Sequence, residues 1–435
     1  MNTRPRNLAA LAAAALLAIA APPAVAQSLL ELYEAAHSYD ATYLSARALA
    51  DSAQYRVEQS RALMRPSASL SSSGGRSQTS PTIGSNNLGA SISGRQPLFN
   101  RANSATIAQS ERSLESSLAD LDTAEQDLVL RLSQAYFDVL GAQDTLQTTQ
   151  ANKTAISEQL ASAKRNFEVG TVSITDTREA QARFDLATAQ EIAATNDLVI
   201  KRIALDQFVG RSDVQPRQIA VPLMLPPTVA TPLDQLVSRA ADEHPAVRRA
   251  QVAFDVAQLE TEKARAQGLP TIDAVASLQS GRGSVSSNIT GNNAGASVGV
   301  QINLPLWTGG AVQNRIKETL VLEERSRNDL EAARRFVTQA TRQAWYTLQS
   351  GAAQIKALEA AEASSQLALE ATQLGYRVGV RVNVDVLNAQ SQLFQTRRDL
   401  ARARYDVLLQ TLRLRQAAGR LAPSDVLAVD RLLVK

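Results

Sequence analysis

Two short segments of the chain combine residue types that can pair through hydrogen bonds. Residues 167–176 read FEVGTVSITD and residues 376–385 read YRVGVRVNVD, so each has an aromatic residue, Val-Gly, a β-branched run and a closing Asp. The offset is 209 residues throughout, matching Gly170 with Gly379 and Asp176 with Asp385. Because glycine accepts left-handed backbone conformations, the repetition predicts two turns of the same design.

The rest of the sequence offers no catalytic constellation. It contains no H-E-x-x-H, G-K-[ST] or S-x-x-K motif. Its two histidines, His37 and His244, lie at corresponding places in the two halves of the chain and are interpreted as packing or surface residues. We therefore predict a protein that is not an enzyme and needs no cofactor or metal.

The first 26 residues have the layout of a secretory signal peptide. Arg4 and Arg6 precede a short apolar run and an AVA cleavage site, with cleavage expected after Ala26. An uncleaved anchor is the alternative, although the run is shorter than the roughly 20 residues of a spanning helix. The sequence has no cysteine. That excludes disulfides and a lipid-modified N-terminal cysteine.

The charge balance argues against nucleic acid as a partner. The formal net charge of +3 includes Arg4 and Arg6, so the exported chain is close to neutral. Aromatic residues make up 4% of the chain. A composition this poor in aromatics favours long, closely packed helices over a thick central core.

The 209-residue offset extends beyond the two turns. QAYFDVL at 134–140 aligns with QAWYTLQ at 343–349, and Gly210 aligns with Gly419. We predict two structural repeats, residues 27–225 and 226–435, joined by the Pro-rich link 221–232.

Each repeat begins with a helix and two strands. The helices are expected at about 29–64 and 231–267, before Pro66 and Pro270. Period-two alternation of apolar and small polar residues predicts strands over 66–78, 87–97, 270–280 and 294–305. Runs of this kind suit half-buried strands or strands of a membrane barrel.

Long helices follow at 101–168 and 310–377, and shorter helices return at 174–209 and 383–418. The first long helix shows heptad spacing, which implies supercoiled packing over roughly 100 Å. Only Glu125, Thr149 and Lys153 interrupt the apolar seam, which is Leu114, Leu118, Leu121, Glu125, Leu128, Leu132, Ala135, Val139, Ala142, Leu146, Thr149, Lys153, Ile156, Leu160, Ala163 and Phe167.

Four strands per chain cannot close a membrane barrel. An open strand edge in lipid leaves backbone groups unpaired, at several kcal/mol each. If the strands enter a bilayer, several chains must therefore share one barrel. A small soluble β-patch beside a coiled-coil rod is the alternative.

The duplicated plan, the junctions QPLF and LPLW around Pro97 and Pro305, and the segment GYRVGVRVNVDVLNAQ resemble the TolC-like outer-membrane channel family. The resemblance covers nearly the whole exported chain. It implies a mainly α fold with a small membrane β part. That fold is a long α-helical barrel of coiled-coil hairpins plus a transmembrane β-barrel shared by a homotrimer, in which Pro97 and Pro305 redirect the chain from strand to helix.

The same resemblance implies a passive, gated exit duct for efflux or type I protein secretion. The duct would sit in the outer-membrane lipid and extend into the periplasm. An inner-membrane ABC or RND-type transporter would energise it through a periplasmic adaptor protein. A periplasmic coiled-coil adaptor or a structural stalk is the alternative function.

By resemblance, the two Val-Gly turns close the periplasmic tip, and Asp176 meets Tyr376 and Arg381 in a latch. The alternative is that these charges are merely solvated. Asp385 matches a constriction-ring aspartate, whereas Asn388 stands where the family pattern has a second Asp. A trimer would then carry three ring charges rather than six. An ordinary helix N-terminal acid is the other interpretation of Asp385.

Overall fold

The computed structural model describes residues 27–80, 83–212, 214–219, 232–285 and 289–433. The predicted signal peptide and most of the predicted link 221–232 lie outside these residues. The first repeat contains α2 (Leu29–Tyr39), α3 (Ala41–Arg61), a 3-10 turn (Ala62–Met64), β1 (Ser67–Ser80), β2 (Ile83–Phe99), α4 (Arg101–Glu168) and α5 (Ile174–Val209). The second contains α6 (Leu233–Glu243), α7 (Pro245–Ala266), β3 (Thr271–Val285), β4 (Ile289–Asn303), α8 (Ala311–Arg377), α9 (Asn383–Ala417) and α10 (Pro423–Asp430).

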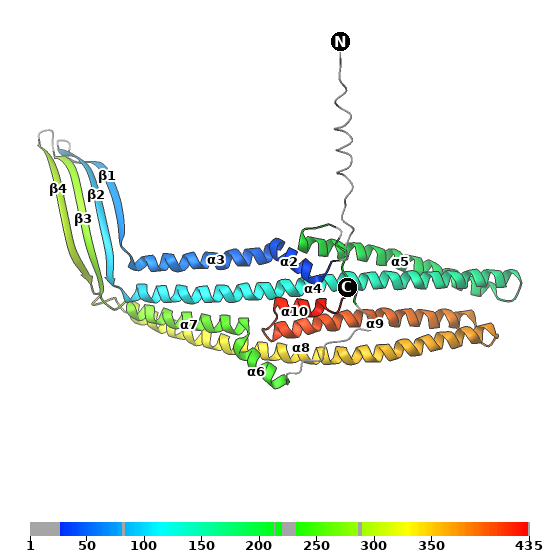
Figure 1. Cartoon of the computed structure of the whole chain (residues 1–435). Coiled ribbons are helices and arrows are strands. Elements are labelled where there is room, and N and C mark those ends of the chain that lie inside the picture. The colour runs from blue at the N-terminus through cyan, green and yellow to red at the C-terminus, as the bar shows by residue number, and fades with distance from the viewer. Residues whose placement is uncertain (1–26, 81–82, 213, 220–231, 286–288, 434–435) are drawn as a thin grey trace, which may run out of the picture.

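The long helices lie side by side as an elongated layer, with the sheet at one end (Figure 1). Helices α3 and α5 follow one another end to end along one side of α4. In the same way, α7 and α9 follow one another between α4 and α8. One edge of the layer is therefore α3 with α5, and the other edge is α8. The two helix–turn–helix tips lie at the end opposite the sheet (Figure 1).

The sheet is a meander in the order β1-β2-β3-β4, all antiparallel, so that β1 and β4 are its edges. Its two faces differ in chemistry. One face has the cross-strand row Leu70, Ile92, Leu278 and Ala296. The other has the row Ser69, Ser93, Ser277 and Ser297, in which Ser69–Ser93 and Ser277–Ser297 are hydroxyl pairs of 2.8 Å.

The heptad seam of α4 is buried in its middle and exposed at its ends. Leu128, Leu132 and Val139 are fully buried, whereas Leu118 and Phe167 are more than 40% exposed. The polar breaks have partners: Glu125 accepts from the Tyr33 hydroxyl at 3.0 Å. Thr149 donates to its own helix backbone, and Lys153 pairs with Glu191 of α5 at 2.7 Å. Each break thus marks a polar contact rather than a fault in the packing.

The single early helix expected in each repeat is wrong, because both are broken in two. The first break is at Asp40, which caps α3 by accepting from the Tyr43 N–H at 2.8 Å and pairs with Arg131 at 3.2 Å. Burial opposes ionisation of Asp40, but these hydrogen bonds prevail and lower its pKa. The second break is at His244, before Pro245.

His244 is a helix cap. Its Nδ1 accepts a hydrogen bond of 3.0 Å from the Ala246 N–H at the start of α7, which requires an unprotonated Nδ1. Gly419, at a φ of +67°, allows the end of α9 to lie close to the backbone of His244, since a Cβ on residue 419 would lie 2.8 Å from the His244 Cα. Burial lowers the pKa of His244, although a hydrogen bond with the Gln416 backbone opposes this. The break therefore joins α6, α7 and the end of α9.

We predict that His244 makes stability fall with acidification. Because its folded pKa lies below the unfolded value of 6.5, its contribution is full above pH 6.5 and is lost as pH falls through the folded pKa. His244→Asn keeps a cap without titration, and His244→Ala removes the cap, costing about 1 kcal/mol at pH 7.5. Denaturation followed by circular dichroism at pH 7.5 and 5.0 measures the difference. The control is His37→Asn, which should keep the wild-type dependence of unfolding free energy on pH. If His244→Asn showed that same dependence, the prediction would be contradicted.

Candidate functional site

The two Val-Gly turns are built alike. In the first, Gly170 has a φ of +76°, and the Thr171 N–H donates to the Asn166 carbonyl at 2.9 Å. In the second, Gly379 has a φ of +81°, and the Val380 N–H donates to the Gly375 carbonyl at 2.9 Å. Both are left-handed glycine caps that satisfy the last carbonyls of a long helix. This geometry explains why Val-Gly recurs in both repeats.

Asp176 lies in the first turn of α5, where it serves its own helix. The Ser173 N–H donates to its carboxylate at 3.3 Å, and the Ser173 side chain caps the helix in return. This is a capping box, with the carboxylate placed favourably at the helix N-terminus.

Arg381 lies in the second turn and pairs with Asp385, one helical turn further on, at 3.6 Å. Gly375 makes room for it, since a Cβ there would lie 2.8 Å from the Arg381 Cγ. Tyr376 is half-buried against the α8–α9 cluster of Leu369, Val386 and Leu393. In the described part of the chain no hydrogen bond or ion pair joins Asp176 to Tyr376 or Arg381. The latch therefore remains a prediction for contacts between copies of the chain.

Within one chain, other residues hold the two tip hairpins together. Arg183 of α5 donates to the Asn388 side-chain oxygen of α9 at 3.0 Å. Gln159 of α4 donates to the side chain of Asn383, which is 2% exposed. These bonds link the α4–α5 hairpin to the start of α9.

Apolar packing supports the same contact. Leu387 of α9 is buried in a cluster whose other members come from α4 and α5, namely Ile156, Leu160, Ala163, Ala180 and Ala187. Gln390, one turn beyond, donates to the Asn152 carbonyl at 3.4 Å. Near the tip, the α8–α9 hairpin is thus held to α4 and α5 by one leucine and a few neutral or singly charged hydrogen bonds. An attachment of this size can be broken by a partner at modest cost.

Sequence reasoning placed Asn388 at the tip but missed Arg183, Gln159, Asn383 and Leu387. The sequence of α9 did contain a pattern that could have indicated three of these contact residues. Asn383, Leu387 and Gln390 recur at the i, i+4 and i+7 spacing of a seam, and amides at seam positions indicate buried polar contacts. Arg183 carried no such signal, because its partner lies 205 residues away.

The two prolines lie at the base of the sheet. Pro97 pairs with Asp273 in the ladder, and the register slips between Pro97 and Phe99, just before Asn100 caps α4. Pro305 follows the end of β4, and two left-handed glycines, Gly309 and Gly310, precede α8. In the first repeat the turn from strand to helix thus involves a bulge, and in the second a loop.

The described residues provide neither a metal-binding cluster nor a membrane-spanning helix. No group of three or more His, Asp or Glu side chains there could hold a metal ion. Among the described helices, none is long and apolar enough to cross a membrane.

The family model described as outer membrane efflux protein matches this chain twice, over residues 32–211 and 236–420. Outer membrane protein TolC of Vibrio cholerae is 32% identical over 410 residues, covering 93% of each chain. Proteases secretion protein PrtF of Dickeya chrysanthemi is 28% identical, covering 94% of this chain and 92% of its own. The crystal structure of the outer membrane protein VceC from Vibrio cholerae matches with a TM-score of 0.75 at 18% identity, covering 90% and 96% of the two chains.

The double match coincides with the two halves that the 209-residue offset defines, and both repeats have the same order of helices and strands. The chain belongs to the outer membrane efflux protein family, as an outer-membrane duct for efflux or secretion whose helical part extends into the periplasm.

Proposed function

We propose that three copies of the chain form a passive, gated exit duct. The observation that carries this proposal is the pair of open edges, since β1 and β4 have no neighbour on one side among the described strands. In lipid those backbone groups must be paired, and the β4 edge of one copy can pair with the β1 edge of the next. Two copies would give an eight-strand barrel with a lumen filled by side chains. Three give twelve strands and leave room for passage.

The two faces of the sheet support this arrangement. The leucine and isoleucine face suits contact with lipid, and the serine face suits a water-filled lumen. Small side chains dominate the serine face, which leaves the lumen wide.

The helical layer has matching open edges. In the described part of the chain the exposed large apolar side chains of the long helices lie mainly on α3, α5 and α8, including Ile192, Ile203 and Phe336. The helices α7 and α9, in the middle of the layer, have none. Edge α8 of one copy would bury its apolar side chains against α3 and α5 of the next, closing the helices into a barrel in the same sense as the strands.

The tip would be the gate. In the closed state the hairpins are tied within each chain by Arg183–Asn388 and Leu387, and between chains by Asp176 with Tyr376 and Arg381. Asp385 and Asn388 would form the narrowest ring, with the charge of Asp385 moderated by Arg381 at 3.6 Å.

Energy for transport would come from outside the chain. An inner-membrane ABC or RND-type transporter, acting through a periplasmic adaptor, is the partner set that we propose. Relatives named for protease secretion and for efflux support both classes of cargo. The alternative of an adaptor or stalk leaves the lipid-suited face of the sheet without a role.

The first test concerns assembly. Phe336→Asp on α8 or Ile203→Asp on α5 places a charge in the proposed interface between copies, which should convert the trimer into monomers. Light scattering of detergent-extracted protein would then give about one third of the wild-type protein mass. Gln392→Asp, on the exposed side of α9, is the control and should leave the trimer intact. Trimers from both edge variants would refute the edge-to-edge arrangement.

The second test concerns the gate. Single-channel conductance in planar bilayers should be small for the wild type and larger for Asp176→Ala/Arg381→Ala. Arg183→Gln should act in the same direction, because a charge-assisted hydrogen bond of about 1.5 kcal/mol changes the closed-to-open ratio about tenfold. Arg402→Gln, which changes an exposed side chain of α9, is the control. Unchanged conductance in the first variant would discard the latch between chains, and unchanged conductance in the second would discard the tie within a chain.

The third test concerns the ring. Asp385→Asn should reduce cation selectivity and weaken block by multivalent cations, because the trimer then loses its three ring charges. Reversal potentials in a salt gradient and titration with a trivalent cation measure both effects, with Asp399→Asn as the control. The same selectivity in Asp385→Asn and wild type would favour a purely helix-stabilising role for this acid.

A further inference from the structure

The sheet contains only four charged residues. Residues 67–99 and 271–303 include Arg76, Arg95, Asp273 and Arg282. Two of these neutralise each other, since Arg95 Nη2 lies 2.6 Å from Asp273 Oδ2 near the helical end of the sheet. Arg76 and Arg282 have no ion pair or side-chain hydrogen bond with any described residue, which leaves a net charge of two positive units on the sheet of each chain.

The register places both arginines on the apolar face. Arg282 of β3 is directly opposite Leu88 of β2, and Leu88 is opposite Gly74 of β1. Arg76 follows Gly74 by two residues and therefore shares its face. Both arginines are exposed, and both lie toward the end of the sheet that is remote from the helices.

The distance of the two arginines from the helical end of the sheet matches the thickness of the apolar part of a membrane. Arg282 stands ten residues beyond Ile272, at the base of β3. At about 3.4 Å per residue this is about 34 Å along the strand. A barrel tilt of about 40° reduces it to about 26 Å, close to the apolar band of about 25 Å in such barrels. Trp307, which is 87% exposed, follows the base of β4, at the level where an aromatic girdle would lie.

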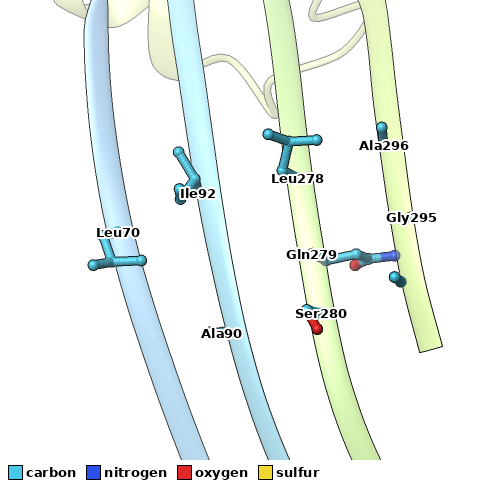
Figure 2. Close-up of a pocket in the computed structure, with 9 residues that line it drawn as sticks. Leu70, Ala90, Ile92, Leu278, Gln279, Ser280, Gly295 and Ala296 are labelled. Atoms are coloured by element: carbon cyan, nitrogen blue, oxygen red, sulfur yellow. The ribbon is translucent and has the colours of Figure 1, made fainter. Parts of the chain in front are cut away.

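An apolar hollow lies on the same face and spans the next two rows of residues from Arg282 toward the helices. Figure 2 shows it between Leu70, Ile92 and Leu278, with the small side chains of Ala90 and Ala296 beside them. Its volume is about 490 Å³. A hollow of this chemistry suits an acyl chain, and the next row outward suits an anionic headgroup.

We propose that Arg76, Arg282 and this hollow bind a phosphate-bearing, acylated lipid of the outer leaflet. The arginines would contact the phosphates, for which the planar guanidinium is well suited, and the hollow would hold an acyl chain. The proposal rests on the proposed membrane barrel, with the helices on the periplasmic side and the arginines therefore at the outer surface. Three copies would display six such arginines around the barrel.

The experiment is native mass spectrometry of the detergent-extracted trimer, titrated with diphosphoryl lipid A or with the same lipid after removal of its phosphates. Wild type should bind the phosphorylated lipid more tightly. Arg76→Gln/Arg282→Gln should weaken that binding roughly thirtyfold at low ionic strength and leave the dephosphorylated lipid unaffected. Ala90→Leu, which fills the hollow, should weaken binding of both lipids. Arg402→Gln, whose side chain on α9 is 84% exposed, is the matched control.

Three outcomes would overturn the proposal: equal wild-type affinity for both lipids, wild-type affinity in the double arginine variant, or complete displacement of the lipid by inorganic phosphate at equal concentration. Single-channel recordings on the same preparations separate the two levels of inference. If the protein forms channels but binds the phosphorylated and dephosphorylated lipids equally, only the lipid site is overturned. Folded protein without channels refutes the duct on which it rests.

Discussion

The pairing of backbone N–H and C=O groups at the two edges of the sheet is the constraint on which the rest of the structure depends. Strands β1 and β4 each leave one row of these groups open, and in a bilayer such groups cannot be satisfied by water. A single chain therefore cannot be the membrane unit. Strand β1 follows α3 and strand β4 precedes α8, and these helices lie at opposite edges of the helical layer (Figure 1). In the proposed assembly, one head-to-tail contact would therefore close strands and helices together.

This shared closure assigns different tasks to the helices. Among the described residues, the inner helices α7 and α9 have no exposed large apolar side chain, whereas α3, α5 and α8 have several, which the proposed assembly would bury against a neighbouring copy. The buried centre around Tyr136 joins α4 to both termini of the described chain, with the Tyr136 hydroxyl donating to the Arg217 carbonyl at 2.9 Å. The middle of the rod is therefore the firmly packed part, and the tip is the part with few apolar contacts.

The proposed gate at the tip has a physical basis. Its hairpins are joined by Leu387 and by hydrogen bonds such as Arg183–Asn388, rather than by an extended apolar seam. Hydrogen bonds exchange with water at little net cost, so the hairpins can separate without unfolding. The glycine caps at Gly170 and Gly379 fix the turns themselves, so that movement would occur between hairpins rather than within them.

The sequence by itself determined the repeats, the long helices, the strands with their alternating faces, and the two turns. These features depend on local periodicity and on glycine, which act over a few residues. Tertiary structure decided the rest. The breaks at Asp40 and His244 could not be predicted, because each cap is stabilised by distant residues, Arg131 in one case and the end of α9 in the other. Likewise Arg183 meets Asn388 only because α5 and α9 cross the same stretch of α4, and no local pattern encodes a contact over 205 residues.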